Sequence, residues 1–270
     1  MDTCGTGGDG AGTFNVSTTC AFVVAGAGVQ VAKHGNRALS SQCGSADVFE
    51  ALGIPMRASP LLALEALERV GICFLFAPFF HKAMKHALVP RQQMGVRTVF
   101  NLLGPLTNPL HATVRLIGVY SRSFVDKLAR VAGELGVARA FVVWGEDGTD
   151  EITVAARTYI CELENGDTRS YWIQPEDYGI TRATREQLAG GAPEQNARMI
   201  LRILQGQEYG PTRDIVLLNA AYCLLGAGKA HSIEQGLEQA RRSIEDRLAL
   251  DKLQQLRTFY RERLERGTQL

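Results

Sequence analysis

Residues 5–10 of this 270-residue chain read GTGGDG, and residues 13–18 read TFNVST. The glycines of the first stretch leave main-chain amides uncovered and permit positive φ angles. A loop of exposed amides directly before a helix binds anionic oxygens, and the helix dipole helps. By itself the loop fits a plain flexible turn equally well, and it lacks the Gly-Lys-Ser/Thr ending of a nucleotide P-loop.

The helix that follows the loop is predicted from Thr13 to Gly28. Its body at residues 20–25 is apolar on nearly all sides, which indicates burial. Asn15 and Ser17 are suited to cap its first amides, and Gly28 is a good left-handed terminator. We expect no strand or helix before Asp2. Since phosphate loops normally follow a strand, we expect a missing upstream segment and an engineered or alternative start at Met1.

The start of this helix is unusually rich in polar side chains. Capping accounts for one or two of them, and a phosphorylated sugar with a bound divalent cation would use the rest. Ser17 or Asp9 has the oxygen that Mg²⁺ prefers. The polar residues concerned are Asp9, Thr13, Asn15, Ser17 and Thr18.

Working outward, helical and apolar strand-like segments alternate, which predicts an α/β fold with a mostly parallel sheet flanked by helices. Residues 157–173 interrupt the alternation as a hairpin that turns at residues 164–167. We expect one domain over residues 1–270, with ligands bound beyond the carboxyl ends of the strands. The predicted strands are 29–32, 72–77, 114–120 and 138–144, and the predicted helices are 45–53, 61–70, 124–135, 212–226, 232–266 and one starting at Pro193.

Three further loops carry charge suited to a phosphorylated ligand. Residues 33–37 read KHGNR and lead to Ser40, Ser41, Gly44 and Ser45, which fits either a pyrophosphate pocket or a solvated basic loop. Residues 145–151 read GEDGTDE after a predicted strand, which fits Mg²⁺ bridged to phosphates or an ordinary acidic turn. Between residues 77 and 109, Arg91 or Arg97 could pair with the carboxylate of an aromatic acid, or form a structural salt bridge.

Composition narrows the class of protein. A net charge of +1 argues against a nucleic-acid binder. Six scattered cysteines with no CxxC pair indicate reduced thiols of a cytosolic protein. With no apolar run long enough for a membrane span and no signal peptide pattern, we expect a cytoplasmic protein without membrane or nucleic-acid partners.

Four motifs in this order make residues 2–151 resemble the anthranilate phosphoribosyltransferase family. They are GTGGDG with TFNVST, KHGNRALSSQCGSAD, RQQMGVRTVFNLLGPLTNP and GTDE. The resemblance implies transfer of phosphoribose from 5-phosphoribosyl 1-pyrophosphate to anthranilate with Mg²⁺, in tryptophan biosynthesis. It also implies a homodimer and an association with the glutamine amidotransferase of anthranilate synthase. The family has a small helical domain before the first loop, so we expect a truncated chain that is inactive or differently assembled.

The resemblance also implies site residues. Lys33 and His34 would be catalytic, and Ser17, Asp150 and Glu151 would bind the metal. Anthranilate would contact Gly5, His34, Asn36, His81, Arg91 and Pro105. The phosphoribosyl donor would contact Gly5, Gly8, Asp9, Thr13, Asn15, Val16, Ser17, Thr18, Lys33, His34, Gly35, Asn36, Arg37, Ala38, Leu39, Ser40, Ser41 and Ser45.

Two other functions are compatible with parts of this pattern. Pyrimidine nucleoside phosphorylases share the general fold, but their lysine-histidine pair is followed by serine-threonine, whereas Gly35-Asn36 follows here. The second is a non-catalytic relative that binds nucleic acid. The near-neutral net charge and the intact Asp150-Glu151 pair both argue against it.

Overall fold

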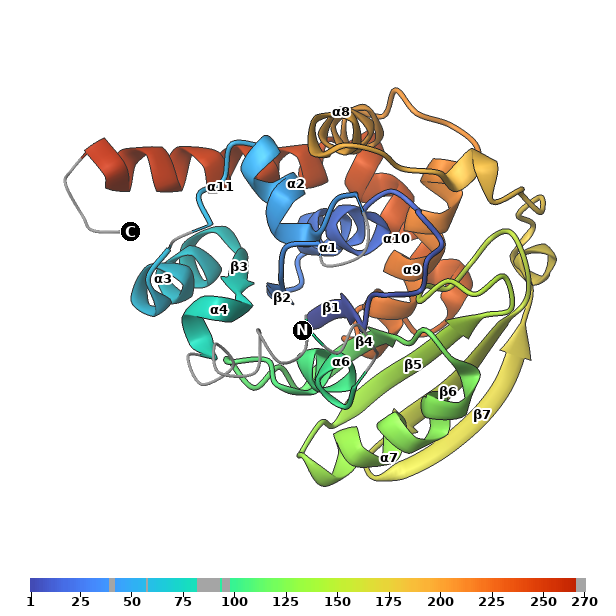
Figure 1. Cartoon of the computed structure of the whole chain (residues 1–270). Coiled ribbons are helices and arrows are strands. Elements are labelled where there is room, and N and C mark those ends of the chain that lie inside the picture. Colours follow the sequence, from blue (N-terminus) through green and yellow to red (C-terminus); the bar gives the residue numbers. More distant parts are fainter. Residues whose placement is uncertain (39–41, 57, 82–92, 94–97, 266–270) are drawn as a thin grey trace.

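The computed structural model describes residues 1–38, 42–56, 58–81, 93 and 98–265 (Figure 1). Its larger sheet has the strand order β1-β4-β5-β6-β7, and a second sheet pairs β2 with β3. The β1-β4-β5 and β2-β3 pairs are parallel, and the β5-β6-β7 pairs are antiparallel. The strands are β1 (Asp2–Gly5), β2 (Val31–Gly35), β3 (Ile72–Phe76), β4 (Val114–Gly118), β5 (Arg139–Gly145), β6 (Thr158–Glu164) and β7 (Asp167–Ile173).

Helices cover both faces of the larger sheet, as expected for an α/β fold. Along β5 the side chains alternate: Ala140 and Val142 pack with α7 (Val125–Glu134), while Phe141 and Val143 join the larger core with α9 (Pro211–Gly226). Figure 1 shows α7 and α9 on opposite sides of the sheet. The remaining α-helices are α1 (Val16–Gly26), α2 (Ser45–Ala51), α3 (Pro60–Val70), α4 (Ala77–Phe80), α6 (Phe100–Leu103), α8 (Pro193–Leu204), α10 (Ile233–Glu245) and α11 (Leu248–Glu265).

A buried carboxylate joins the two sheets at β1 and β2. Asp2 is fully buried, and its side chain accepts hydrogen bonds from the His34 amide (3.1 Å) and the Asn108 Nδ2 (2.8 Å). Asn108 Nδ2 also donates to the Ala32 carbonyl oxygen (2.8 Å), and the Ala32 amide donates to Met1 O (2.9 Å). These bonds hold the start of β1 against β2, so the two strands lie side by side and the loops that follow them share one region.

The expectation of no strand before the glycine-rich loop is wrong, because Asp2–Gly5 is β1. The segment is short and partly polar, so it shows no strand pattern of its own. Its pairing with Arg115 to Gly118 of β4, distant in sequence, makes it a strand. The loop therefore does follow a strand that fixes it.

Two predicted helix boundaries also change. The first helix begins at Val16 and not at Thr13, because Thr13 forms a β-bridge with Ala189. The predicted helix over 232–266 divides into α10 and α11 at Arg247, which has a φ of 61°. The hairpin turn is confirmed, with positive φ at both Asn165 (50°) and Gly166 (96°) as a type I′ turn requires.

No helix in the described part of the chain is long and apolar enough to cross a membrane.

The close approach of the acidic loop to β4 gives a test of the fold. A Cβ atom at Gly118 would overlap the main-chain carbonyl of Asp150, which cannot move without displacing the loop. We expect Gly118→Ala to lower the free energy of unfolding by more than about 2 kcal/mol. Gly104→Ala is the matched control, since its φ is −49° and a Cβ there meets no atom within 4 Å. Equal denaturant midpoints for the two variants would contradict this packing.

Candidate functional site

The glycine-rich loop after β1 has the conformation that its composition predicts. Gly7, Gly8, Gly10 and Gly12 have φ angles between 60° and 71°, which side chains rarely adopt. The Gly7 amide donates a hydrogen bond to Asp150 Oδ2 (2.8 Å). The loop is therefore tied to the acidic loop after β5, and the sheet brings these two sequence motifs together.

Two glycines leave room for Asp150. A Cβ at Gly5 would overlap the Asp150 carboxylate, and one at Gly118 would overlap its main chain. Asp147 shapes the turn by accepting hydrogen bonds from Thr149 Oγ1 (2.9 Å) and Thr153 Oγ1 (2.7 Å). The acidic loop thus places the Asp150 carboxylate against the end of β1.

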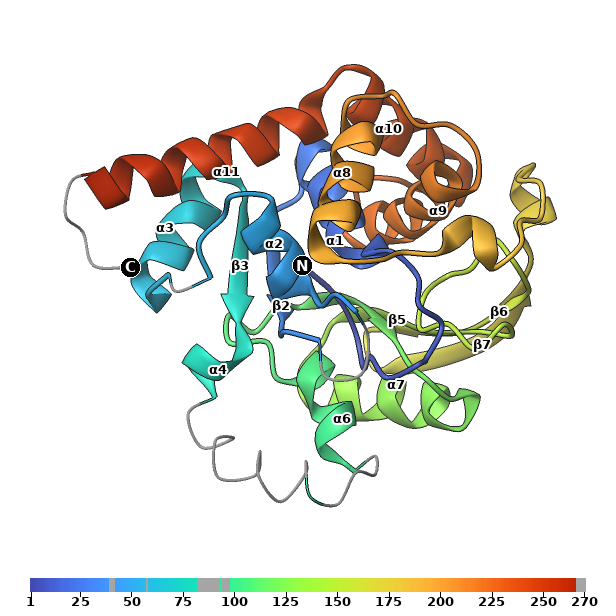
Figure 2. The same ribbon diagram turned by 45° about the horizontal axis from the view of Figure 1, so that its top comes forward.

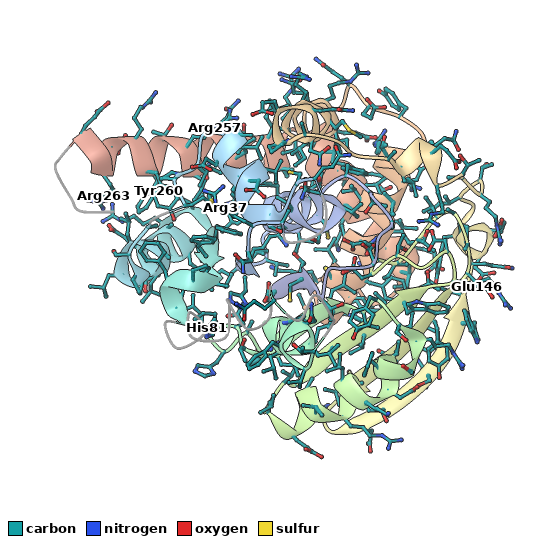
Figure 3. The ribbon with its side chains drawn as sticks, in the orientation of Figure 1. Arg37, His81, Glu146, Arg257, Tyr260 and Arg263 are labelled. Atoms are coloured by element: carbon teal, nitrogen blue, oxygen red, sulfur yellow. The ribbon has the colours of Figure 1, made fainter. Side chains whose placement is uncertain are left out.

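Glu146 of the same loop forms an ion pair away from the glycine-rich loop. Glu146 forms a bidentate pair with Arg157 at 2.7 and 2.9 Å. In Figure 3 it lies at the right edge of the molecule, far from Arg37 and His81. Of the four acidic residues between Gly145 and Ile152, only Asp150 and Glu151 therefore face the glycine-rich loop and α1.

The negative charges of Asp150 and Glu151 are only partly compensated by nearby groups. Loss of solvation, and next the charge of Asp9, raise the pKa of Asp150 to about 7. Burial, and next the charge of Asp150, raise the pKa of Glu151 well above its ordinary value, although Lys33 and the Ser17 amide oppose this. A divalent cation would relieve this crowding of negative charge.

The donor set fits Mg²⁺ bound together with a ligand. No group of three or more His, Cys, Asp or Glu side chains suited to hold a metal occurs within the described residues. Mg²⁺ commonly takes only one or two carboxylates from the protein and fills its shell with waters and ligand phosphates. Asp150, Glu151 and the Ser17 hydroxyl suit that arrangement better than a closed protein cage.

Lys33 brings a positive charge to the base of the glycine-rich loop. Its side chain is 1% exposed, and its Nζ donates to the Thr3 carbonyl oxygen and to Ser17 Oγ (3.2 Å). The ammonium group therefore lies between the end of β1 and the start of α1. Its interaction with Glu151 links this cation to the acidic pair.

His34 and His81 form a second part of the site. Their rings meet edge to face at 5.1 Å, and His34 Nδ1 lies 3.1 Å from the Gly104 carbonyl oxygen. That contact requires a proton on Nδ1, which leaves Nε2 as an acceptor. Burial lowers the pKa of His34, and its Nε2 has no hydrogen-bond partner in the part of the chain described. The predicted neighbour Pro105 follows Gly104, and its carbonyl oxygen accepts a hydrogen bond from Arg115 (2.8 Å).

The loop after β2 is organised by Asp47, which the sequence did not single out. Its carboxylate accepts hydrogen bonds from the Ala38 amide (3.0 Å) and the Gly44 amide (2.9 Å). Arg37 pairs with Asp47 (2.7 Å) and Glu50 (2.8 Å), and in Figure 3 it lies beside α2. The guanidinium of Arg37 therefore stabilises the first turns of α2.

Other predicted residues differ in accessibility. Asn36 is exposed, and its Oδ1 accepts a hydrogen bond from the Arg37 amide (2.8 Å). Val16 and Thr18 are buried within α1, and Thr18 Oγ1 has no partner among the residues described. Ser45 begins α2. Leu39, Ser40, Ser41, Arg91 and Arg97 lie outside the described residues.

The predicted capping role of Asn15 is wrong. Its side chain makes no capping hydrogen bond to α1. Its Nδ2 donates instead to the Cys43 carbonyl oxygen (3.3 Å), and its Oδ1 accepts from Asn196 Nδ2 (2.9 Å). Asn196 was not predicted as a site residue, because the sequence around Pro193 shows only a helix start.

Comparisons with known proteins agree with this geometry. The family model described as "Glycosyl transferase family, a/b domain" matches residues 1–250. The chain is 52% identical over 259 residues to the anthranilate phosphoribosyltransferase of Desulfosudis oleivorans, covering 96% of this chain and 76% of the relative. It is 53% identical over 260 residues to that of Desulfotalea psychrophila, with coverage of 96% and 74%.

Solved structures give the same result. The anthranilate phosphoribosyltransferase of Thermus thermophilus superimposes with a TM-score of 0.91 at 45% identity, over 96% of this chain and 77% of that chain. The Saccharomyces cerevisiae enzyme in complex with PRPP and Mg superimposes with a TM-score of 0.89 at 31% identity, over 96% and 72%.

The raised pKa of Asp150 predicts a pH effect on stability. Between about pH 4 and about pH 7 the folded protein keeps a proton that the unfolded chain has released, so the free energy of unfolding falls as pH rises. Without divalent cations, wild type should lose about 1–3 kcal/mol relative to Asp150→Asn between pH 5 and 8 in urea unfolding. Glu146→Gln is the control, because Arg157 lowers the pKa of Glu146 and this carboxyl group is ionised throughout that range. A flat difference between wild type and Asp150→Asn would contradict the raised pKa.

Proposed function

The chain belongs to the anthranilate phosphoribosyltransferases, within the glycosyl transferase family that has this α/β domain, and on that basis we propose how its residues bind the two substrates. The protein is an enzyme that transfers phosphoribose from 5-phosphoribosyl 1-pyrophosphate to anthranilate, giving N-(5-phosphoribosyl)anthranilate and pyrophosphate in tryptophan biosynthesis. It uses Mg²⁺, in line with the yeast structures that contain Mg. The relatives support this activity over nucleoside phosphorolysis and over nucleic-acid binding.

The observation that carries the site assignment is the hydrogen bond between the Gly7 amide and Asp150. It joins a loop of amides, which attracts phosphate oxygens, to carboxylates that call for a cation. A magnesium pyrophosphate needs both kinds of group in one place. We therefore assign Ser17, Asp150 and Glu151 as the metal-binding residues.

The donor binds along the glycine-rich loop, the start of α1 and the loop after β2. When bound, the metal neutralises negative charge on the pyrophosphate. Lys33, fixed against Thr3 and Ser17, adds a positive charge that favours pyrophosphate as the leaving group. The donor contacts are Gly5, Gly8, Asp9, Thr13, Asn15, Val16, Ser17, Thr18, Gly35, Asn36, Arg37, Ala38, Leu39, Ser40, Ser41 and Ser45.

The acceptor binds on the side of His34, with Gly5, Asn36, His81, Arg91 and Pro105 as its neighbours. The bond from C1 of the ribose to pyrophosphate breaks with its electron pair on pyrophosphate, and the amine nitrogen of anthranilate bonds to C1. The amine then loses a proton, for which His34 Nε2, without a partner among the residues that the structure describes, is an acceptor. The arylamine is already unprotonated at neutral pH, so catalysis depends mainly on orienting the two substrates.

Features beyond the site belong to the same proposal. We assign residues 1–270 to one domain, because the larger core combines side chains from α1, β3, α9 and α11. The six cysteines are buried free thiols, which supports a cytoplasmic location. We also propose a homodimer, with anthranilate synthase's amidotransferase as a further partner.

A fluorescence assay tests the proposed reaction and its dependence on Mg²⁺. Adding 5-phosphoribosyl 1-pyrophosphate should cause a Mg²⁺-dependent loss of anthranilate fluorescence. Asp150→Asn should raise the Mg²⁺ concentration needed for half-maximal rate by about tenfold or more, because a charged oxygen ligand is lost. Glu146→Gln, in the same loop but paired with Arg157, should leave it unchanged. Phosphorolysis of thymidine or uridine without anthranilate consumption would refute the proposed function.

Alanine substitutions test which of the two candidate arginines binds the carboxylate of anthranilate. Arg91→Ala should raise the KM for anthranilate by about tenfold to a hundredfold, because a bidentate pair with the carboxylate is lost. The KM for the phosphoribosyl donor should change much less. Arg97→Ala is the comparison and should affect anthranilate weakly. An unchanged KM and rate for anthranilate in Arg91→Ala would remove Arg91 from the site.

A further inference from the structure

The segment before α8 packs directly on the glycine-rich loop. The Gly190 amide donates to the Gly12 carbonyl oxygen (2.9 Å), and the Phe14 amide donates to the Leu188 carbonyl oxygen (3.1 Å). A Cβ at Gly190 would overlap the main chain of Phe14. In Figure 2, α8 lies beside α1 and α2. The C-terminal third therefore reaches the loop to which we assign the phosphorylated donor.

Asn196 of α8 is the buried side chain at this contact. It is 1% exposed, its Oδ1 accepts from the Gly191 amide (2.8 Å), and its Nδ2 donates to Asn15 Oδ1 (2.9 Å). The amide of Asn196 is thus oriented by a main-chain donor, which can only face its oxygen. Consequently its NH₂ group must face Asn15.

The orientation of the Asn196 amide in turn determines the orientation of the Asn15 amide. Since Asn15 Oδ1 faces Asn196, its NH₂ group faces the Cys43 carbonyl oxygen, at 3.3 Å, in the loop after β2. The Cys43 thiol also interacts with the side chains of Asn15 and Asn196, so the NH₂ group of Asn15 lies against both polar groups of Cys43. The chain Gly191–Asn196–Asn15–Cys43 thereby fixes the NH₂ end of the Asn15 amide toward the loop after β2.

We propose that Asn196 is a positioning residue for the phosphoribosyl donor, which acts by fixing the Asn15 amide with its NH₂ group toward the loop after β2. This rests on the proposed role of Asn15 in donor binding. The phosphate and pyrophosphate oxygens of this ligand accept hydrogen bonds, so an N–H group of Asn15 facing the loop after β2 favours its binding. A reversed amide would present a carbonyl oxygen to those acceptors and repel them.

Asn196→Asp tests the proposal with little change in shape. The carboxylate still accepts from the Gly191 amide, but it cannot donate to Asn15 Oδ1, so Asn15 must turn its NH₂ group toward residue 196. We expect the KM for 5-phosphoribosyl 1-pyrophosphate to rise by about tenfold. The KM for anthranilate should stay within about twofold. Gln195→Glu makes the same amide-to-carboxylate change at the adjacent, exposed position and should alter neither KM.

A double-mutant cycle separates positioning from general loss of structure. If Asn196 acts through Asn15, then Asn15→Ala should abolish the effect of Asn196→Asp, and the double variant should equal Asn15→Ala. Equal losses for both substrates, an undiminished effect in the Asn15→Ala background, or donor KM values that match Gln195→Glu would each overturn the proposal. If Asn196→Asp does not fold, Asn196→Ser is measured, and its donor KM should also rise selectively.

The wild-type protein is measured first for Mg²⁺-dependent anthranilate turnover, and donor binding is measured by calorimetry. Absence of both turnover and donor binding would refute the proposed function. Normal wild-type turnover with Asn196→Asp behaving as Gln195→Glu would refute only the role of Asn196.

Discussion

The buried carboxylate of Asp2 is the interaction on which the rest of the structure depends. It holds β1 and β2 side by side by accepting hydrogen bonds from His34 and Asn108, where the two strands lack a full ladder. The glycine-rich loop leaves the end of β1, and the lysine-histidine loop leaves the end of β2. Because both strands are fixed to one buried group, amides, lysine and histidine occupy one region.

In the proposed site, adjacent groups would meet opposite requirements of the two substrates. The anionic donor would meet amides, Lys33 and carboxylates suited to a cation. The acceptor must lose a proton, and it would meet a buried histidine whose lowered pKa favours the neutral form. Burial thus has two effects here: it raises the pKa of the carboxyl groups, and it keeps His34 available as an acceptor.

The sequence was sufficient for the α/β class and for the expectation of charged loops at the carboxyl ends of the strands, because helical and apolar strand-like segments alternate along it. It did not reveal β1, which is a strand only through its pairing with β4. It assigned Asn15 a local capping role, whereas the side chain bonds Asn196, far along the chain. It did not reveal that Asp47 and Glu50 pair with the guanidinium of Arg37. Local sequence pattern predicts local structure, whereas β1, Asn15 and Arg37 each depend on partners outside their own segment.

Gly118 shapes the site because it has no Cβ atom. The obstacle to a side chain there is the main chain of Asp150, which every residue type possesses. No substitution at residue 150 would make room, so a change at residue 118 has no single compensating partner. In evolutionary terms, this position is restricted by geometry and not by chemistry. A relative in which the proposed metal-binding carboxylates have changed is therefore still expected to need glycine at the position of Gly118.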